Sequence, residues 1–509
     1  MAVIGAGVSG LAAAKCLLDE GLEPVVYEQA AQIGGLWNYD ETLPDGGGVM
    51  YRSLHTNTSK QTLAFSDFPL PQTAPDYPHR SEVLQYLRDY AAHFRLHRLI
   101  RLNTDVESVE PAAQDRWTVR ARRGAEVTTE TFDAVVVCNG RDHFPQLPQL
   151  PGADTFAGQL LHSSRYKGPE AFAESRVVVA GAGSSGVDIA TELSSVAEQV
   201  CLSTESGAWF IPRFILNRPY DHHLTRLAQR LPYRLRMALF QRLLLLEYRR
   251  MGVTLRQLRA RGLPLPRFDL WSARLTPCND LLPRIQRGAI EVKPRIVQLK
   301  GHEVRFADGS VVEADAIVCC TGYTLRFPFL PEGLVHVKEN RVDLYKHVFH
   351  PDLPTLAFVG LCTVAGSHLP VAEMQGRWVA RMLAGRLSLP SQEEMHAAIE
   401  QYRAHPSSQS PVPMQVQLLE YVEDLAAMLG VRPRIFRHPS AAPRWFLGPF
   451  SAAHYRLDEP QQSQGGTLEG STGQSRFGIE RDRFFLYIDR LFGRRSRAWN
   501  SAKSSASGG

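Results

Sequence analysis

The sequence has little of what marks secreted, metal-binding or membrane-spanning proteins. Its seven cysteines are spread over 509 residues without a Cys-x-x-Cys pair, which argues against a disulfide framework, a zinc site and dithiol chemistry and indicates a reducing compartment. No run of about 18 apolar residues indicates a transmembrane helix, and no signal peptide precedes the first predicted strand. The net charge of +5 is too small to indicate nucleic-acid binding. We therefore expect an intracellular protein that holds no metal ion.

What the sequence does contain is typical of a large α/β protein. Hydrophobic residues make up 44% of the chain, which also carries 39 glycines and 33 prolines. The chain is longer than one hydrophobic core usually supports. We therefore expect two intertwined domains with extensions.

The first glycine-rich loop lies at the start of the chain, in AVIGAGVSGLAAAKCLLDE (2–20). A buried strand, Ala2–Ile4, is followed by glycines in G-x-G-x-x-G spacing and then by a helix, and a second strand (23–27) ends in an acidic residue. The glycines allow a tight turn and a close approach to a pyrophosphate, and the acid accepts ribose hydroxyls. The predicted dinucleotide contacts are Gly5, Ala6, Gly7, Val8, Ser9, Gly10, Glu28 and Gln29.

A second loop of the same kind occurs in RVVVAGAGSSGVDIATELSS (176–195). We predict a strand at Arg176–Ala180, a helix at Val187–Leu193 and a further strand at Gln199–Ser203. The predicted contacts are Gly181, Gly183, Ser184, Ser185, Gly186 and Asp188. Two such loops indicate two dinucleotides, FAD on the first and NAD(P)H on the second, although a degenerate second copy that binds nothing is the alternative.

Further motifs resemble those of the flavin-containing monooxygenases, especially the animal branch of that family. Phe156, Gly158, His162 and Tyr166 match its F-x-G-x-x-x-H-x-x-x-Y pattern, and the related Baeyer–Villiger monooxygenases carry Trp in place of this tyrosine. Other matching stretches are QIGGLWNYDETLPDGGGVMYRSLHTNTSKQTLAFSDF (32–68), the Thr-Gly-Tyr at 321–323, EMQGRWVARML (373–383) and FLGPFSAAHYRL (446–457). The resemblance covers about residues 2–457.

The resemblance implies a mixed α/β fold of two nested dinucleotide-binding domains and an oxygenation reaction. NADPH would reduce FAD, O2 would add to the flavin C4a atom, and the hydroperoxide would oxygenate nitrogen or sulfur in small molecules such as xenobiotics, giving N-oxides and S-oxides. By resemblance, Asn57 is the catalytic amide beside flavin and nicotinamide, although it could instead cap a turn. The remaining expected flavin-site residues are Gly35, Leu36, Trp37, Thr56, Thr58, Val106, Thr321 and Gln375, the last expected just before a helix. His162 is expected to fix the link between the domains rather than to catalyse.

One position departs from the family pattern. Animal relatives carry an arginine for the NADPH 2′-phosphate where this chain has Glu205, which follows Gly186 at about the spacing of a ribose-binding acid. NADPH is expected on family grounds, and a relaxed preference that admits NADH is the hypothesis that Glu205 suggests. Thr204 and Arg213 are the expected residual phosphate contacts; the alternative is that Glu205 points to solvent.

The expected organisation places the nicotinamide domain inside the flavin domain. The segments are 1–145 and 330–445 for the FAD-binding domain, 146–329 for the NAD(P)H-binding domain with a helical insertion at about 210–280, and 446–509 for a C-terminal extension with a flexible linker at 461–475. Residues 224–250 and 481–498 mix apolar residues with arginine and could lie on a membrane surface. By resemblance the protein lies at the periphery of the endoplasmic reticulum membrane; a cytoplasmic location is the alternative.

Other functions stay open at this point. The same cofactors could carry out Baeyer–Villiger oxygenation of ketones, or act as an uncoupled NAD(P)H oxidase that releases hydrogen peroxide. The chain could also be a non-catalytic cofactor-binding scaffold that uses its basic insertion to hold a membrane or a partner. Ketone turnover, peroxide release and absence of flavin, respectively, would identify these alternatives.

Overall fold

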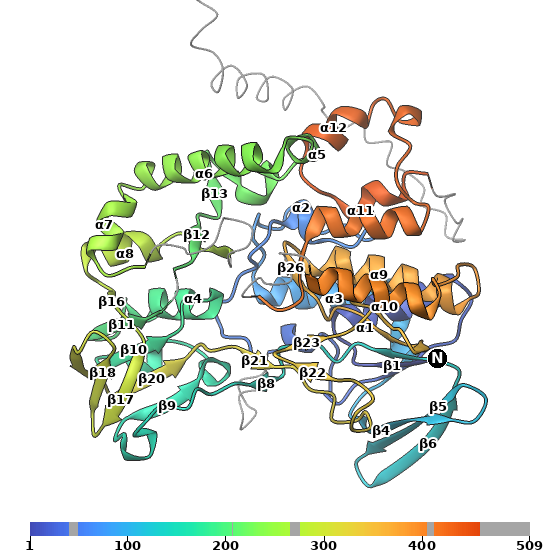
Figure 1. Cartoon of the computed structure of the whole chain (residues 1–509), viewed down its shortest axis with the longest axis horizontal. Helices are drawn as coiled ribbons and strands as arrows, with labels where there is room; N and C mark the ends of the chain where they lie inside the picture. The colour runs from blue at the N-terminus through green and yellow to red at the C-terminus, as the bar shows by residue number, and fades with distance from the viewer. Residues whose placement is uncertain (40–48, 206, 265–274, 405–411, 459–509) are drawn as a thin grey trace, which may run out of the picture. The chain divides into compact units, whose positions relative to one another are not determined.

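The computed structural model describes residues 1–39, 49–205, 207–264, 275–404 and 412–458, which belong to one compact unit (Figure 1). The predicted tail at 481–498 and the linker at 461–475 lie outside these residues. Two largely parallel sheets dominate the unit, and each has a glycine loop after one of its central strands.

The first sheet combines strands from both ends of the described chain. Its order is β24 (Phe349–His350), β25 (Leu353–Phe358), β7 (Val135–Val137), β1 (Ala2–Ile4), β2 (Val25–Tyr27) and β3 (Ile100–Arg101). All neighbours are parallel except β24 and β25. Strand β2 begins at Val25 rather than at the predicted Glu23, because Pro24 has no N–H to give to the ladder.

The second sheet is parallel throughout, and its strands lie in the sequence between β7 and β24 of the first sheet. Its order is β16 (Glu291–Lys293), β11 (Gln199–Ser203), β10 (Arg176–Ala180), β20 (Ala316–Cys319) and β9 (Gln159–His162). One dinucleotide-binding fold is therefore inserted into another, which confirms the predicted fold class. The domain boundaries at 145, 329 and 445 stay predictions.

Smaller strands extend the two folds. They are β4 (Asp105–Ala112), β5 (Arg116–Arg123) and β6 (Glu126–Phe132); β17 (Ile296–Lys300), β18 (Glu303–Phe306) and β19 (Val311–Glu313); and the pairs β8 (Phe144–Pro145) with β21 (Tyr323–Thr324), β12 (Trp209–Ile211) with β15 (Leu275–Pro277), β13 (Phe214–Ile215) with β14 (Arg218–Pro219), β22 (Val337–Lys338) with β23 (Arg341–Val342), and β26 (Thr363–Ala365) with β27 (Gln415–Gln417).

Helices α1 (Val8–Asp19) and α9 (His368–Leu383) pack closely against each other in the first fold. A Cβ on Gly376, in the middle of α9, would lie 3.3 Å from the Ala13 Cα of α1. The expectation that Gln375 lies just before a helix is therefore wrong: Gln375 lies in the middle of α9, and the glycine after it allows the two helices to pack closely. The other helices of this fold are α2 (Lys60–Leu63), α3 (Arg80–His93), α10 (Gln392–Ala404), α11 (Leu418–Met428) and α12 (Ala442–Leu447).

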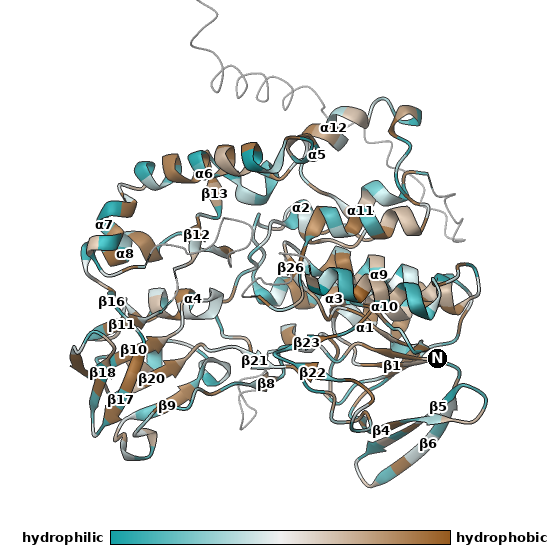
Figure 2. Ribbon diagram, viewed as in Figure 1, coloured by the Kyte–Doolittle hydropathy of each residue, from teal (hydrophilic) through white to brown (hydrophobic). Residues whose placement is uncertain are grey.

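The second fold carries α4 (Ser184–Leu193), α8 (Leu281–Arg287) and the helices of the insertion. Residues 224–250 form two helices, α5 (Arg226–Gln229) and α6 (Tyr233–Arg250), because Pro232 interrupts the predicted stretch, and α7 (Leu255–Ala260) follows. Figure 2 shows apolar and polar residues interleaved along α6. In the part of the chain that the structure describes, none of the helices combines the length and the apolar character that a membrane span requires.

One buried arginine joins the insertion to the C-terminal part of the first fold. The Arg226 side chain is only 8% exposed and lies 3.4 Å from the centre of the Trp445 ring. It pairs with Glu423 at 3.0 Å and donates to the Tyr455 hydroxyl at 2.8 Å. Helix α5 is thus held against α11 and α12 through a charge that would be costly to leave unpaired.

Candidate active site between two dinucleotide loops

The first loop is built so tightly that two of its positions accept only glycine. Gly5 has φ +102, and a Cβ there would lie 2.6 Å from the Cys138 carbonyl oxygen. A Cβ on Gly10 would lie 1.8 Å from the Gly5 oxygen. The buried Glu28 carboxylate accepts hydrogen bonds from the Ala6 and Ala30 amides at 2.7 and 2.9 Å, so it stands at the loop, as the sequence predicts.

The Gly-Gly-Leu-Trp segment lies directly over this loop. The Gly34 amide donates to the Ala6 oxygen at 3.0 Å, and a Cβ on Gly35 would lie 2.9 Å from the Gly7 Cα. Leu36 and Trp37 follow in a short 3-10 helix and are half-buried. The structure therefore brings these predicted cofactor residues to the same loop.

Gln375 is completely buried, and its amide is used within the protein. Its oxygen accepts from the Gly360 amide at 2.8 Å, and its nitrogen donates to the Tyr421 hydroxyl at 2.8 Å. A Cβ on Gly360 would lie 1.9 Å from the Ser9 hydroxyl oxygen. Gln375 thus holds the segment that packs on the first loop, while its contact with the flavin pyrimidine stays a prediction.

The second loop repeats the geometry of the first. Gly181 has φ +111, and a Cβ there would lie 2.5 Å from the Cys320 carbonyl oxygen; a Cβ on Gly186 would lie 1.8 Å from the Gly181 oxygen. Helix α4 begins at Ser184, inside the motif, so its first amides face the loop. The residues present therefore fit two dinucleotides, one at each loop.

Asn57 lies in a loop that is fixed from several sides. The Thr56 hydroxyl donates to the Thr58 carbonyl at 2.9 Å, and both threonines are buried. Tyr220 donates to the Asn57 carbonyl at 3.0 Å, and Arg213 Nη2 lies 3.5 Å from Asn57 Oδ1. Because a guanidinium only donates, this contact assigns the amide orientation. In the described part of the chain both partners bind oxygen atoms, so the Asn57 nitrogen keeps two hydrogens for a ligand.

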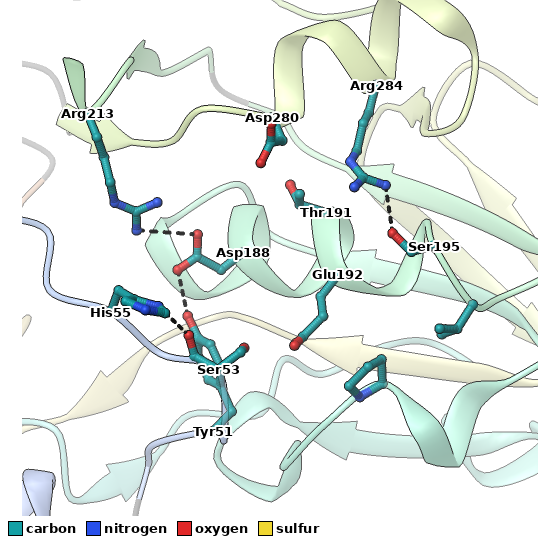
Figure 3. Close-up of a pocket in the computed structure, with 12 residues that line it drawn as sticks. Tyr51, Ser53, His55, Asp188, Thr191, Glu192, Ser195, Arg213, Asp280 and Arg284 are labelled. Atoms are coloured by element: carbon teal, nitrogen blue, oxygen red, sulfur yellow. Dashed lines mark hydrogen bonds and ion pairs between the residues drawn. The ribbon is translucent and has the colours of Figure 1, made fainter. Parts of the chain in front are cut away.

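Arg213 connects Asn57 with helix α4, and Figure 3 shows its side chain beside Asp188 of that helix. Its Nη2 lies 4.0 Å from Asp188 Oδ1, and the Tyr51 hydroxyl donates to Asp188 Oδ2 at 2.7 Å. The Arg213 amide donates to Asn279 Oδ1 at 2.9 Å, which fixes the backbone. Burial raises the pKa of the Asp188 carboxyl, and Arg213 and Tyr51 oppose that rise. The predicted phosphate contact Arg213 is thus brought to the catalytic candidate.

A pocket of about 400 Å³ runs along α4 beside these side chains (Figure 3). Charged residues of both signs line it, among them Asp188, Glu192, Arg213 and Arg284. Arg284 Nη1 donates to the hydroxyls of two serines at the end of α4, at 2.7 and 2.9 Å. The pocket therefore suits a polar ligand group and shares Asp188 and Arg213 with the Asn57 cluster.

Glu205 lies just beyond β11 and is paired with a residue that the sequence analysis missed. The Glu205 side chain is 67% exposed, and Arg295 Nε lies 3.9 Å from its Oε1. Thr204 is buried, and its amide donates to the Lys293 carbonyl at the end of β16. The sequence alone does not show that β16 is the parallel neighbour of β11. With that strand order known, Arg295, which lies just after β16, would have been a candidate.

The remaining predicted residues lie around the first fold. Gln29 is exposed after Glu28, and Val106 is buried in β4, whose preceding residue Thr104 donates its amide to the Glu28 carbonyl at 2.8 Å. The Thr321 hydroxyl donates to the Gln146 carbonyl. His162, at the end of β9, contacts the Ser164 hydroxyl at 3.1 Å and the Gly322 carbonyl at 3.0 Å, which are contacts of a linker.

Two nested dinucleotide folds, each with its own glycine loop, are typical of an oxidoreductase that transfers electrons between two dinucleotides. A family model described as flavin-binding monooxygenase-like matches residues 1–476, and the chain belongs to that family. It is a flavin-containing monooxygenase that depends on NADPH and O2, with FAD implied as the flavin. The predicted family is confirmed.

Relatives and solved structures agree with this assignment. The chain is 39% identical to the N-oxide-forming dimethylaniline monooxygenase 2 of Mus musculus, over 91% of this chain and 89% of that one. It is also 39% identical to flavin-containing monooxygenase 5 of Cavia porcellus, over 91% and 90%. The structure of S-allyl-L-cysteine S-oxygenase from Allium sativum is similar, with a TM-score of 0.63 and 28% identity over 87% of this chain and 92% of that one. An open structure of cyclohexanone monooxygenase shares the fold, with a TM-score of 0.63, 20% identity, and coverage of 84% and 97%.

Proposed function

We propose that this enzyme oxygenates soft nucleophilic nitrogen and sulfur atoms of small molecules, foreign amines and sulfides included. The observation that carries the proposal is the Asn57 amide, which is held by Arg213 and Tyr220 with both hydrogens of its nitrogen available. The names of two relatives support the same proposal, since one forms N-oxides and the other oxygenates a thioether.

The protein's part in this reaction is to bind, orient and donate. FAD, when bound, supplies the oxygen activation. The Asn57 amide donates hydrogen bonds where negative charge develops on oxygen, and it does so without titrating. Arg213 keeps the amide in that orientation, and Asp188 offsets the Arg213 charge from α4. The two glycine loops would hold the pyrophosphates of the two dinucleotides, one at the start of α1 and one at the start of α4.

The test compares products with NADPH consumed, using N,N-dimethylaniline, methyl p-tolyl sulfide and cyclohexanone as substrates. We expect N-oxide and sulfoxide in amounts close to the NADPH consumed, with little hydrogen peroxide. Asn57→Ala should shift consumption toward peroxide, while the exposed control Val311→Ser should not. Ester from cyclohexanone as the main product would establish Baeyer–Villiger oxygenation instead. Peroxide alone would establish an oxidase, and protein without flavin would support a scaffold.

We also propose a relaxed nicotinamide preference that admits NADH. Glu205 stands at the end of β11 with most of its side chain exposed, where an acid accepts the ribose hydroxyls of NADH. We expect Glu205→Arg to raise the ratio of kcat/KM for NADPH to that for NADH by about tenfold or more, as a charge-assisted contact with phosphate does. An unchanged ratio would remove Glu205 from cofactor choice.

A further proposal concerns membrane contact through α5 and α6, at the endoplasmic reticulum as the resemblance implies. By helical spacing, Leu235, Leu239 and Leu246 share one face, roughly opposite the buried Phe240 and Leu244. Exposed large apolar residues of this region are Leu227, Leu231, Tyr233, Leu235, Leu239 and Leu246, and exposed arginines are Arg230, Arg234, Arg242, Arg249 and Arg250. Leucines mixed with arginines favour an anionic lipid surface.

Vesicle sedimentation tests this contact. We expect wild-type protein to sediment with phosphatidylcholine vesicles that contain phosphatidylserine and to be released by salt. The double variant Leu235→Ser/Leu239→Ser should lose this binding, whereas Val311→Ser, at a side chain 41% exposed like Leu239, should keep it. Equal binding by both variants, or none by the wild type, would rule the surface out. Phe436, in the C-terminal part, is 98% exposed, and its substitution by serine tests whether this part also contacts the vesicles.

A further inference from the structure

The carboxyl edge of the second sheet brings together two opposite charges that are far apart in the sequence. Glu205 follows β11 and Arg295 follows β16, and these strands are parallel neighbours with Ser203 opposite Lys293. Arg295 Nε lies 3.9 Å from Glu205 Oε1, and the two side chains are 61% and 67% exposed. The second glycine loop follows β10, the next strand of the same sheet, so both charges lie at the edge where the dinucleotide is expected.

This edge is where a dinucleotide fold distinguishes NADPH from NADH. An acid at the end of the strand accepts hydrogen bonds from the two ribose hydroxyls, and an arginine donates hydrogen bonds to the 2′-phosphate. Glu205 alone would repel a phosphate dianion, yet the enzyme depends on NADPH. Since this chain lacks the arginine that animal relatives carry in place of Glu205, another cation must bind the 2′-phosphate.

The positions of the nearby cations favour Arg295 for this role. Arg213, the sequence-based candidate, is turned toward Asn57 and Asp188. Lys293 is largely covered and is paired with Glu291 at 2.6 Å. Arg295 is open to solvent, and its long pair with Glu205 costs little to break, because exposed ion pairs contribute little free energy. Its planar guanidinium can bind a phosphate through two parallel hydrogen bonds.

We propose that Arg295 binds the 2′-phosphate of NADPH and that Glu205 and Arg295 act as a pair in cofactor choice. When the 2′-phosphate is present, the Arg295 guanidinium moves from Glu205 to the phosphate. When the ribose carries a hydroxyl there, Glu205 accepts that hydroxyl and keeps Arg295 as its countercharge. This inference rests on the proposed function only in that the second loop holds the nicotinamide dinucleotide.

The test measures binding of two adenosine fragments, 2′,5′-ADP and 5′-ADP, to the FAD-loaded enzyme by calorimetry, so that turnover is not needed. We expect Arg295→Gln to weaken 2′,5′-ADP binding by about tenfold or more and to leave 5′-ADP unchanged. Arg305→Gln is the matched control, because Arg305 is an exposed arginine on β18, the strand paired with β17, and its loss changes the net charge by the same amount. Glu205→Gln should strengthen 2′,5′-ADP binding and weaken 5′-ADP binding.

Each result separates this proposal from the proposed function. Arg295→Gln that binds 2′,5′-ADP as tightly as the wild type overturns the role of Arg295, and so does an equal loss for both fragments. Wild-type protein that binds the two fragments equally overturns it as well, while oxygenation with NADPH would leave the monooxygenase assignment standing. Binding of neither fragment, together with failure of NADPH to reduce the flavin, would instead refute the use of the second loop. Thermal unfolding and flavin content confirm that each variant is folded.

Discussion

Gly186→Ala is the substitution that most directly distinguishes the role of the second glycine loop from that of the first. A Cβ at this position would lie 1.8 Å from the Gly181 carbonyl oxygen and 3.2 Å from the Cys320 Cβ. Since non-bonded heavy atoms do not approach below about 3 Å, the start of α4 must move by more than about 1 Å. Overpacking of this kind costs about 1–3 kcal/mol. The second fold should therefore survive, but with its loop displaced.

The functional consequence follows from the displaced amides. The first amides of α4 would no longer meet the pyrophosphate of the nicotinamide dinucleotide, and a shift of about 1 Å can cost about 100-fold in rate. Anaerobic stopped-flow absorbance at the flavin band measures reduction by NADPH. We expect Gly186→Ala to retain FAD and to be reduced normally by dithionite. At low NADPH concentration, its flavin should be reduced about 100-fold more slowly than that of the wild type.

The mirror-image substitution in the first loop is the control. Gly10→Ala meets the Gly5 oxygen at the same 1.8 Å, so it should lose FAD itself, which the ratio of visible to ultraviolet absorbance reports. Gly186→Ala that reacts with NADPH at the wild-type rate would refute the geometric argument. Loss of FAD from Gly186→Ala would show that the two loops are not independent.

Three further outcomes follow from groups that are buried or half-buried. Burial lowers the pKa of His347 to about 4, so only the unfolded chain binds this proton between pH 6.5 and 4. The free energy of unfolding should therefore fall by about 3 kcal/mol as the pH is lowered over that range. Urea unfolding of His347→Leu should show a smaller fall. Arg226→Ala removes one of the cations paired with Glu423, which keeps Arg432 and Tyr455, and should cost about 1–3 kcal/mol in urea unfolding; a loss below about 0.5 kcal/mol would show that the pair is merely a surface contact. Arg213→Gln should release Asn57 and raise the peroxide formed per NADPH, and unchanged coupling would contradict the positioning role.

Local sequence was sufficient for both cofactor loops. The strands Ala2–Ile4, Arg176–Ala180 and Gln199–Ser203 have the bounds that the sequence predicts, because short buried runs ending at glycine or a polar turn leave little choice. The start of α4 was predicted at Val187 and lies at Ser184, since helical hydrogen bonding begins within the glycine motif itself. The family and the nested fold followed from the resemblance of the chain's motifs to those of a known family.

Tertiary structure alone decided which charges meet. The sequence places Gln375 just before a helix, whereas α9 runs through it, because Gly376 allows close packing against Ala13. Likewise, no periodicity relates Arg213 to Asn57 or Arg295 to Glu205, because these contacts depend on the order of strands in a sheet and on the fit of one fold against another. A sequence determines which dinucleotide loops can form, since backbone sterics act over a few residues. Which side chains face the cofactors depends on packing between segments far apart in the chain.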